Sequence, residues 1–417
     1  MGKAPVRIGI DLTPVLPGSA NGGAKFAALE FIGILLRDFS DQFHLTLFLP
    51  EIALEELSAY FPGRADLKCT RFVRQRINAL SEGIEELKNQ NRMRRICRQN
   101  SIQVFYSPFG RFVSLPLEMP FVAQVHDLIH LDYPKTLSRQ DRLWRHFNLL
   151  KLTLRRAIFQ VSSEFTRQRL HTAYSVPLEC VHRTYLPIQG RFSIEETECK
   201  APFFLYPARA WPHKNHENLL YAHDIYRKRL GKRAWKLVVT AGHDERSKGL
   251  RSLACSLGLE GDVKFQGEVD ESELNRLYQS ASALIFPSRY EGFGIPLIEA
   301  MHFGLPIICG RGGSQLEVAG EAAIFVDVED PEDMAAAMER LTEDGALREQ
   351  LVSGGKRQLE KFVLKAEIEK LMGVFEKYSE GTFWPGRLQK LSRSLAILFL
   401  DLLYAASAIF LSTFRKK

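Results

Sequence analysis

The stretch SALIFPSRYEGFGIPLIEAMHFGLP, residues 282–306, reads as a strand, a glycine-containing loop and a helix. The apolar run at 283–286 predicts a buried strand. Proline favours the first turn of a helix, so Ile295–Pro296 predicts a helix start. Gly292 and Gly294 permit a ligand to approach the backbone closely. The N–H groups and the positive dipole end at such a start favour an anion.

The same strand–helix alternation extends in both directions along the chain. It predicts parallel sheets covered by helices on both faces, hence an α/β fold with two Rossmann-like domains facing across a cleft. A ligand would bind in that cleft. The expected divisions are an N-terminal acceptor-side domain at 1–187, a linker at 188–202, a C-terminal donor-binding domain at 203–360, a crossover helix at 361–380 and a C-terminal apolar helix within 385–417.

The expected strands follow from short apolar runs between turn residues. In the first half they lie at 7–12, 44–48, 104–106, 121–124 and 158–161, and in the second at 203–206, 236–240, 263–265, 283–286, 306–309 and 323–326.

The bulk composition constrains the class of protein. The 417 residues suit two or three domains, and the formal net charge of +7 suits an anionic partner, which is a nucleic acid, a phosphorylated substrate or a membrane surface. The six cysteines form no CxxC pair, which favours reduced thiols in a cytoplasm. The N-terminus lacks the long apolar core expected of a signal peptide.

Two carboxylates frame the loop at 282–306, Glu291 before the helix and Glu299 one turn into it. Carboxylates accept hydrogen bonds from sugar hydroxyls, so this pair predicts contacts with a sugar and a ribose. An E-x7-E spacing alone is equally compatible with two solvated acids.

A second motif, YPARAWPHKNHENLL at 206–220, places cations beside a helix start. Arg209 offers a bidentate fork and Lys214 a point charge, which suits a diphosphate. Asn215 is expected to cap the next helix. A solvated basic loop is the alternative interpretation.

The acceptor-side half contributes two further candidates. His126 ends a strand in VAQVHDLIHLDYP, where it points into the cleft or pairs structurally with Asp127. Gly22 and Gly23 precede a helix and form either a ligand-approach site or a flexible loop. No G-x-G-x-x-G follows a strand in the right place, which disfavours nicotinamide or flavin binding.

The segment PSRYEGFGIPLIEAM resembles the E-x7-E signature of family 4 of the retaining glycosyltransferases, which have the GT-B fold. The resemblance extends to about residue 375 and implies a nucleoside diphosphate sugar donor. It assigns Glu291 and His126 to the donor sugar, Glu299 to the ribose, and Arg209 and Lys214 to the diphosphate. It also implies backbone contacts from Phe293, Gly294, Ile295, Pro296 and Leu297, with Asn215, Gly22 and Gly23 lining the donor site.

The resemblance further implies retention of configuration by front-face attack. Cations and a helix dipole would stabilise the leaving diphosphate, so no metal or other cofactor is expected. The phrases HDLIHLDYP and WPHKNH resemble mannosyl- and rhamnosyltransferases of surface polysaccharide assembly, which favours mannose as the sugar and a lipid-linked or glycan acceptor. The alternatives are a non-catalytic sugar-nucleotide-binding subunit, or a GT-B epimerase or phosphorylase. No nucleic-acid motif supports nucleic-acid binding.

The apolar stretch at 394–414 carries one charge, Asp401, between basic flanks. As a helix it would measure roughly 31 Å, about one bilayer core. Small and polar residues share one face, so we expect a helix lying in the membrane interface or packed on a partner rather than a lone span. Packing on the protein's own body is the alternative. The expected location is the cytoplasm, at the inner face of the cytoplasmic membrane.

Overall fold

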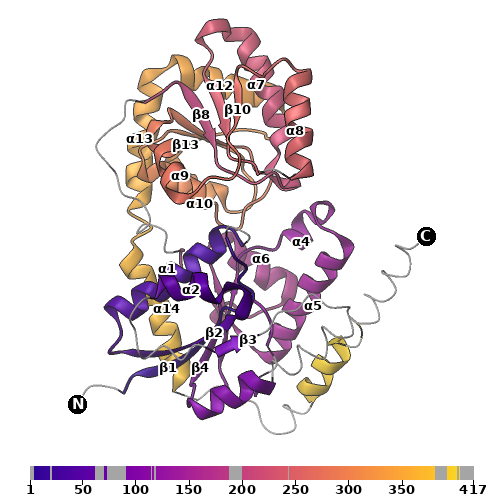
Figure 1. Cartoon of the computed structure of the whole chain (residues 1–417), viewed down its shortest axis with the longest axis vertical. Coiled ribbons are helices and arrows are strands. Elements are labelled where there is room, and N and C mark those ends of the chain that lie inside the picture. The colour runs from indigo at the N-terminus through magenta and orange to yellow at the C-terminus, as the bar shows by residue number, and fades with distance from the viewer. Residues whose placement is uncertain are drawn as a thin grey trace.

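The computed structural model describes residues 4–18, 21–61, 70–72, 91–113, 115–116, 119–186, 200–242, 244–380, 392–401 and 403. These form two α/β domains, one above the other in Figure 1, and each is built on a parallel sheet. The α/β fold with two Rossmann-like domains is confirmed. Most of the expected linker and much of the expected C-terminal helix lie outside the described residues, and the domain boundaries stay predictions.

The first sheet has seven strands in the order β3-β2-β1-β4-β5-β6-β7. Neighbouring strands are parallel, with Ile8 opposite Leu45 on one side and Val104 on the other. The strands are β1 (Val6–Asp11), β2 (Phe43–Pro50), β3 (Thr70–Phe72), β4 (Val104–Ser107), β5 (Phe121–Val125), β6 (Ile158–Val161) and β7 (Val181–Arg183).

Helices cover both faces of this sheet because each presents an apolar stripe to it. One face packs on α1 (Gly23–Asp38), α2 (Leu54–Tyr60) and α14 (Leu364–Ser379). The other packs on a helical segment at 91–99, on α5 (Arg139–Arg155) and on α6 (Glu164–Tyr174). The short helix α4 (Ile129–Asp132) follows β5.

The second sheet has six parallel strands in the order β10-β9-β8-β11-β12-β13. They are β8 (Phe203–Tyr206), β9 (Lys236–Val239), β10 (Val263–Phe265), β11 (Ala283–Phe286), β12 (Ile307–Cys309) and β13 (Ala323–Phe325). The helices are α7 (His216–Leu230), α8 (Glu245–Ser256), α9 (Glu271–Ser280), α10 (Ile295–His302), α11 (Gln315–Ala319), α12 (Pro331–Glu343) and α13 (Gly345–Leu359).

The chain returns to the first domain at its end. Helix α14 follows the second domain but buries Ile368, Leu371 and Phe375 against the first sheet, as Figure 1 shows. Helix α14 lies within the range 361–380, where the sequence predicts a crossover helix, and its core contacts are in the first domain.

Both sheets reverse their strand order once. In the first sheet the reversal lies between β1 and β4, and in the second between β8 and β11. Ligands of open α/β sheets bind outside the carboxyl ends of the strands at such a point. The fold therefore predicts two ligand positions, one in each domain.

Residues 392–401 form a helix that lies beside α5 (Figure 1). Ile397 is buried in the first domain's core, and Lys151 Nζ lies 2.7 Å from Asp401 Oδ1. Within the described ranges, none of the helices combines the length and apolarity that crossing a bilayer requires. The part of the expected helix that the structure describes therefore packs on the protein's own body.

Candidate active site

The reversal point of the second sheet brings together the loops that follow β8 and β11. Lys214, at the end of the first loop, places its Nζ 2.5 Å from Oε1 of Glu291 in the second. Both side chains are 13% exposed, so the pair is largely shielded from water. Lys214 Nζ also lies 5.3 Å from the centre of the Phe286 ring. The sequence placed these two charges 77 residues apart, and the fold makes them partners.

Arg209 lies on the same loop as Lys214 but points to another carboxylate. Its Nη2 is 3.2 Å from Oε1 of Glu268, in the FQGEV segment after β10. The guanidinium also lies 6.0 Å from the Trp211 ring centre. The Arg209 side chain remains 34% exposed. Both cations therefore face the carboxyl edge of the sheet, each held by an acid that an anion would displace or share.

Helix α10 begins as the sequence predicts, with Ile295 and Pro296 in its first turn. Gly294 precedes it with φ of 90° and ψ of 58°, a left-handed conformation that favours glycine. Pro296 has no N–H, and the N–H of Leu297 is bonded to Gly294 O at 2.9 Å. In this conformation Pro296 and Leu297 therefore offer no amide to a ligand. Phe293 is 5% exposed and stacks on Tyr185.

Glu299 lies inside the domain, with 3% of its surface exposed. Its Oε2 accepts a hydrogen bond of 2.5 Å from the hydroxyl of Tyr278, which lies on α9 and is fully buried. The Tyr278 ring stacks on Phe303 with 5.4 Å between ring centres. The carboxylate is thus held in a defined orientation behind the start of α10, and its contact with a ribose stays a prediction.

The expected capping role of Asn215 is wrong. Asn215 occupies the N-cap position of α7, but its side chain makes no capping hydrogen bond. Its φ of 60° turns the residue into a left-handed conformation, and Nδ2 instead donates to Val328 O at 2.6 Å. The side chain is fully buried, so it ties the loop that carries Lys214 to the strand end near Val328.

His126 directly follows β5 in the first domain. Its Nε2 lies 2.8 Å from Pro108 O, and a carbonyl only accepts, so Nε2 carries the proton. Burial lowers the pKa of His126, although the bond to Pro108 opposes that effect. The neutral ring then presents Nδ1 as an acceptor. A Cβ added at Gly292 would lie 1.8 Å from His126 O, so the two loops touch across the cleft.

Gly22 and Gly23 lie at the start of α1, where Gly22 has φ of 56°. A Cβ added at Gly23 would lie 2.6 Å from Cδ1 of Ile295, the first residue of α10. The two helix starts therefore meet across the cleft. A side chain at position 23 would require the Ile295 side chain to shift.

Comparison with known proteins indicates similarity to glycosyltransferases. A family model described as glycosyl transferases group 1 matches residues 191–358. Residues 191–358 are thus similar to glycosyl transferases group 1. It is 28% identical over 229 residues to the O-antigen chain mannosyltransferase RfbU of Salmonella typhimurium, covering 55% of this chain and 62% of that protein. It is 30% identical over 186 residues to O-antigen chain mannosyltransferase B of Escherichia coli, and this alignment covers 45% of this chain and 46% of that protein. The chain thus spans about half the length of these curated relatives.

Solved structures match over nearly the whole chain. Anabaena HepE, solved with UDP and glucose, superposes with a TM-score of 0.69 at 16% identity, over 89% of this chain and all of that one. WaaG, a glycosyltransferase involved in lipopolysaccharide biosynthesis, superposes with a TM-score of 0.66 at 14% identity. The superposition covers 88% of this chain and 99% of that one. At such identities the likeness shows the fold, which is GT-B.

The second domain is joined to the first domain by contacts around one helix. Glu317, on α11, accepts the N–H groups of Glu164 and Phe165 at 2.9 and 3.2 Å, which caps the start of α6. Ser163, just before α6, donates to Gly292 O at 2.8 Å. The two domains are therefore held close together in this conformation.

Tyr290 adds a further contact between the second domain and the first domain. Its hydroxyl accepts the N–H of Leu128 at 3.1 Å, and its ring packs on Tyr133 and Phe165. No sequence pattern predicted this role, the cap from Glu317 or the hydrogen bond from Ser163. Each depends on a neighbour more than 100 residues away.

Proposed function

We propose that this protein is a retaining glycosyltransferase that moves a sugar from a nucleoside diphosphate sugar to a glycan or lipid-linked acceptor. The observation that carries the proposal is the Lys214–Glu291 pair, 2.5 Å long, at the reversal point of the second sheet beside the start of α10. The pair lies where open α/β sheets bind ligands. Lys214 supplies a cation for a diphosphate, and Glu291 supplies a carboxylate for sugar hydroxyls.

In this proposal donor binding separates the pair. Lys214 turns to the diphosphate, and Glu291 is released to accept hydroxyls of the donor sugar. Arg209, 34% exposed on the same loop, adds a second cation. These charges stabilise the negative charge that develops on the departing diphosphate. Because protein cations fill this role, the reaction needs no metal.

The proposed chemical step balances without a cofactor. The bond between the anomeric carbon and the diphosphate oxygen breaks, and an acceptor hydroxyl attacks the same face of the sugar. A departing phosphate oxygen takes the proton of that hydroxyl, and configuration is retained. Neutral His126, with Nδ1 as acceptor, would contact a hydroxyl of the donor sugar from the opposite side of the cleft.

Mannose is the sugar we propose. Two curated relatives are named O-antigen mannosyltransferases, although each alignment covers only part of the relative. The HepE structure holds UDP and glucose, so the fold itself accommodates more than one donor. We therefore propose GDP-mannose as the donor and a surface-polysaccharide intermediate as the acceptor.

Calorimetry with the full chain tests the donor site. GDP-, UDP- and ADP-sugars are titrated without metal into the protein and into Glu299→Ala and Lys214→Met variants. We expect one nucleotide class to bind and both variants to lose at least about tenfold in affinity, or about 1.4 kcal/mol. Product anomeric configuration by NMR then tests retention. Binding without turnover would indicate the non-catalytic subunit instead.

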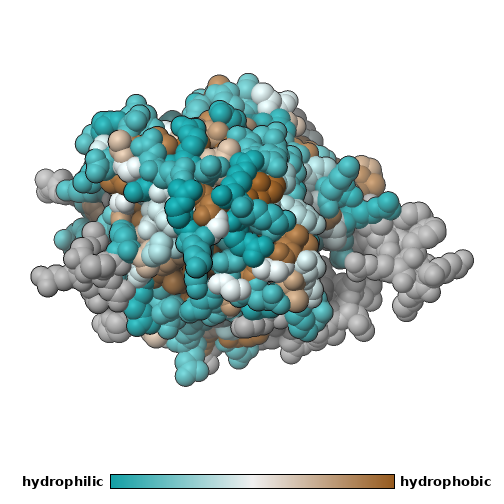
Figure 2. All heavy atoms as spheres, turned by 90° about the horizontal axis from the view of Figure 1, so that it is seen from above, coloured by the Kyte–Doolittle hydropathy of each residue, from teal (hydrophilic) through white to brown (hydrophobic). Residues whose placement is uncertain are grey.

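We also propose that the C-terminal helix contacts an anionic membrane surface. Leu395, Leu398, Phe399 and Leu403 are 40–60% exposed, and their spacing places them along one side of the helix. Viewed from above, the molecule is mostly hydrophilic, with apolar residues in small groups (Figure 2). An apolar helix stripe that basic residues flank in the sequence suits a bilayer interface.

Vesicle co-sedimentation tests the membrane contact. Vesicles of phosphatidylglycerol and phosphatidylethanolamine should retain the full chain, and Leu398→Ser/Phe399→Ser should release it. The matched control is Leu316→Ser, at a comparably exposed leucine of the other domain. Equal retention of all three proteins would refute the assignment.

A further inference from the structure

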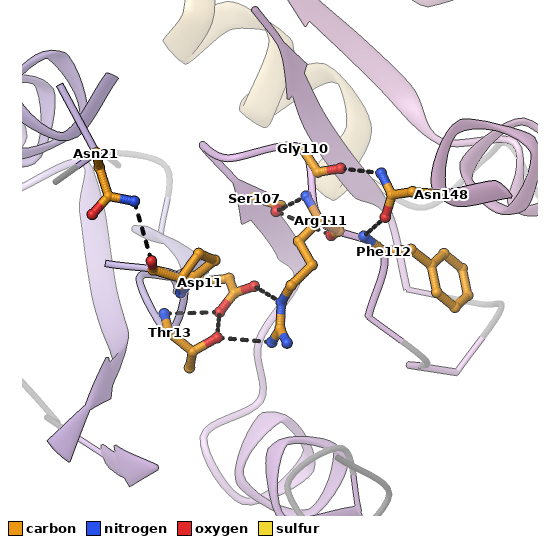
Figure 3. A network of polar contacts seen from close by, with 9 residues as sticks. Asp11, Thr13, Asn21, Ser107, Gly110, Arg111, Phe112 and Asn148 are labelled. Carbon is orange, nitrogen blue, oxygen red and sulfur yellow. Dashed lines mark hydrogen bonds and ion pairs between the residues drawn. The ribbon is translucent and has the colours of Figure 1, made fainter. Parts of the chain in front are cut away.

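The reversal point of the first sheet holds a polar cluster of its own, shown in Figure 3. Asp11 ends β1, Thr13 follows it, and Arg111 lies on the loop after β4. The proposed donor site uses the corresponding point of the second sheet. This cluster thus occupies the other ligand position that the strand order predicts.

The three side chains form one hydrogen-bonded unit. Asp11 accepts the Thr13 hydroxyl at 2.6 Å, the Thr13 N–H at 3.1 Å and Arg111 Nε at 3.3 Å. Arg111 Nη2 donates to Thr13 Oγ1 at 2.7 Å. Asp11 is fully buried while the Arg111 side chain is 22% exposed. A ligand would therefore meet the guanidinium, and Asp11 would act behind it as a positioning residue.

The backbone around Arg111 is held from two other elements. Ser107 Oγ accepts the Arg111 N–H at 3.0 Å, and Asn148 on α5 donates to Gly110 O at 2.7 Å while accepting the Phe112 N–H at 2.8 Å. Gly110 has φ of +60°, and an added Cβ would lie 2.4 Å from Gln124 O. A partly exposed arginine fixed this firmly is the arrangement that ligand sites require.

The cluster lies on the side of the first sheet that faces the second domain. The carboxyl ends of parallel strands share one edge, and His126 at the end of β5 touches Gly292 of the other domain. At the end of β1, the loop containing Thr13 leads to Gly23, which touches Ile295. The cleft is thus bordered by Arg111 on one side and by the Lys214–Glu291 pair on the other.

We infer that Arg111 binds hydroxyl groups of the acceptor's terminal sugar, an inference that rests on the proposed transferase function. The charge balance favours a neutral ligand, because Asp11 cancels the charge of Arg111. Lys25 is likewise paired with Glu56, and the distance from Lys25 Nζ to Glu56 Oε1 is 2.5 Å. A phosphate site would present surplus positive charge, as Lys214 and Arg209 do once a donor displaces their acids. Planar guanidinium groups donate two hydrogen bonds to vicinal oxygens, which suits a sugar ring.

The test measures glycoside and anion binding separately. Full-length protein saturated with its nucleotide is titrated by saturation-transfer NMR with the methyl glycosides of mannose, rhamnose, glucose, galactose and N-acetylglucosamine, and with inorganic pyrophosphate. We expect at least one glycoside to bind. Arg111→Ala should weaken that binding at least about tenfold while nucleotide affinity stays unchanged. Arg37→Ala is the matched control, because Arg37 is 66% exposed at the far end of α1.

Asp11→Asn provides a readout that a purely structural role would not produce. Removing the buried charge leaves the cluster with a net positive charge, so glycoside affinity should fall and pyrophosphate affinity at this site should rise. Unchanged glycoside binding in Arg111→Ala, or no glycoside bound by nucleotide-loaded protein, would overturn the role of Arg111. Either result would leave the proposed transferase function standing. Arg111-dependent binding of pyrophosphate by the unaltered protein would assign the site to a phosphate instead. Failure to bind any nucleotide sugar would overturn the proposed function.

Discussion

Lys214 and Glu291 form an ion pair across the reversal point of the second sheet, with Nζ and Oε1 2.5 Å apart and both side chains 13% exposed. The pair holds a cation and a carboxylate ready where a donor would bind. An anion that attracts Lys214 simultaneously releases Glu291. In the proposed function, one binding event therefore prepares both groups.

Lys214→Met should lower turnover by about 10²–10³-fold, because it removes a charge that stabilises the leaving group. Steady-state kinetics with the donor identified by calorimetry measures the effect. Lys248→Met is the control, since Lys248 is 65% exposed on α8 and pairs only with nearby Glu245 among the ion pairs of the described residues. A loss of less than about threefold in Lys214→Met would contradict the role of Lys214.

Tyr278→Phe should reduce both stability and nucleotide affinity. The change keeps the ring stacked on Phe303 but removes the hydroxyl that donates to buried Glu299. Leaving a buried acceptor without this partner costs about 1–3 kcal/mol. Thermal unfolding and calorimetry with the nucleotide report the two effects. If stability falls but nucleotide affinity does not, Glu299 is structural and its ribose contact is wrong.

Glu317→Ala should loosen the contact between the domains, because Glu317 caps α6 of the other domain through two N–H groups. Hydrogen bonds to a charged group contribute about 1.5–3 kcal/mol each. Small-angle scattering of the ligand-free protein should give a larger radius of gyration. Glu321→Ala is the matched control, since Glu321 pairs with Arg357 inside one domain and is 71% exposed. Equal radii for both variants would show that Glu317 does not hold the domains together.

Stability should decrease as pH falls from about 6.5 toward 5. Burial lowers the pKa of His223 to about 4, and burial together with Lys214 lowers the pKa of His213 to about 4. Below the unfolded pKa of about 6.5, the unfolded chain binds protons that the folded chain excludes, so protonation favours unfolding. Carboxylates such as Glu329, whose pKa is lowered by Arg289, lose their contribution only at more acidic pH.

Thermal unfolding at pH 7, 6 and 5 measures this effect. His223→Gln should show a shallower decrease than the unaltered protein, because fully buried His223 then no longer contributes. His44→Gln, at an exposed position, should leave the pH dependence unchanged. A parallel decrease in all three proteins would exclude His223 as a source.

The local sequence determined most strands of both sheets, but it did not predict β3 or β7. Apolar runs bounded by turn residues predicted strands such as 158–161 and 283–286 with the observed limits, and Pro296 predicted the start of α10. These features depend on backbone conformation and on periodic burial, which neighbouring residues largely decide. The family signature also named Lys214 and Glu291 as neighbours of one ligand.

Only the tertiary structure decided which distant groups meet. The strand order joined Asp11 to Arg111, 100 residues away, and brought Glu317 to the start of α6. It also turned Asn215 away from its expected cap, because a hydrogen bond to Val328 O competes for the same side chain. A sequence pattern specifies local periodicity. These contacts arise from the strand order within each sheet and from the packing of the two domains, which the pattern of any single segment does not contain.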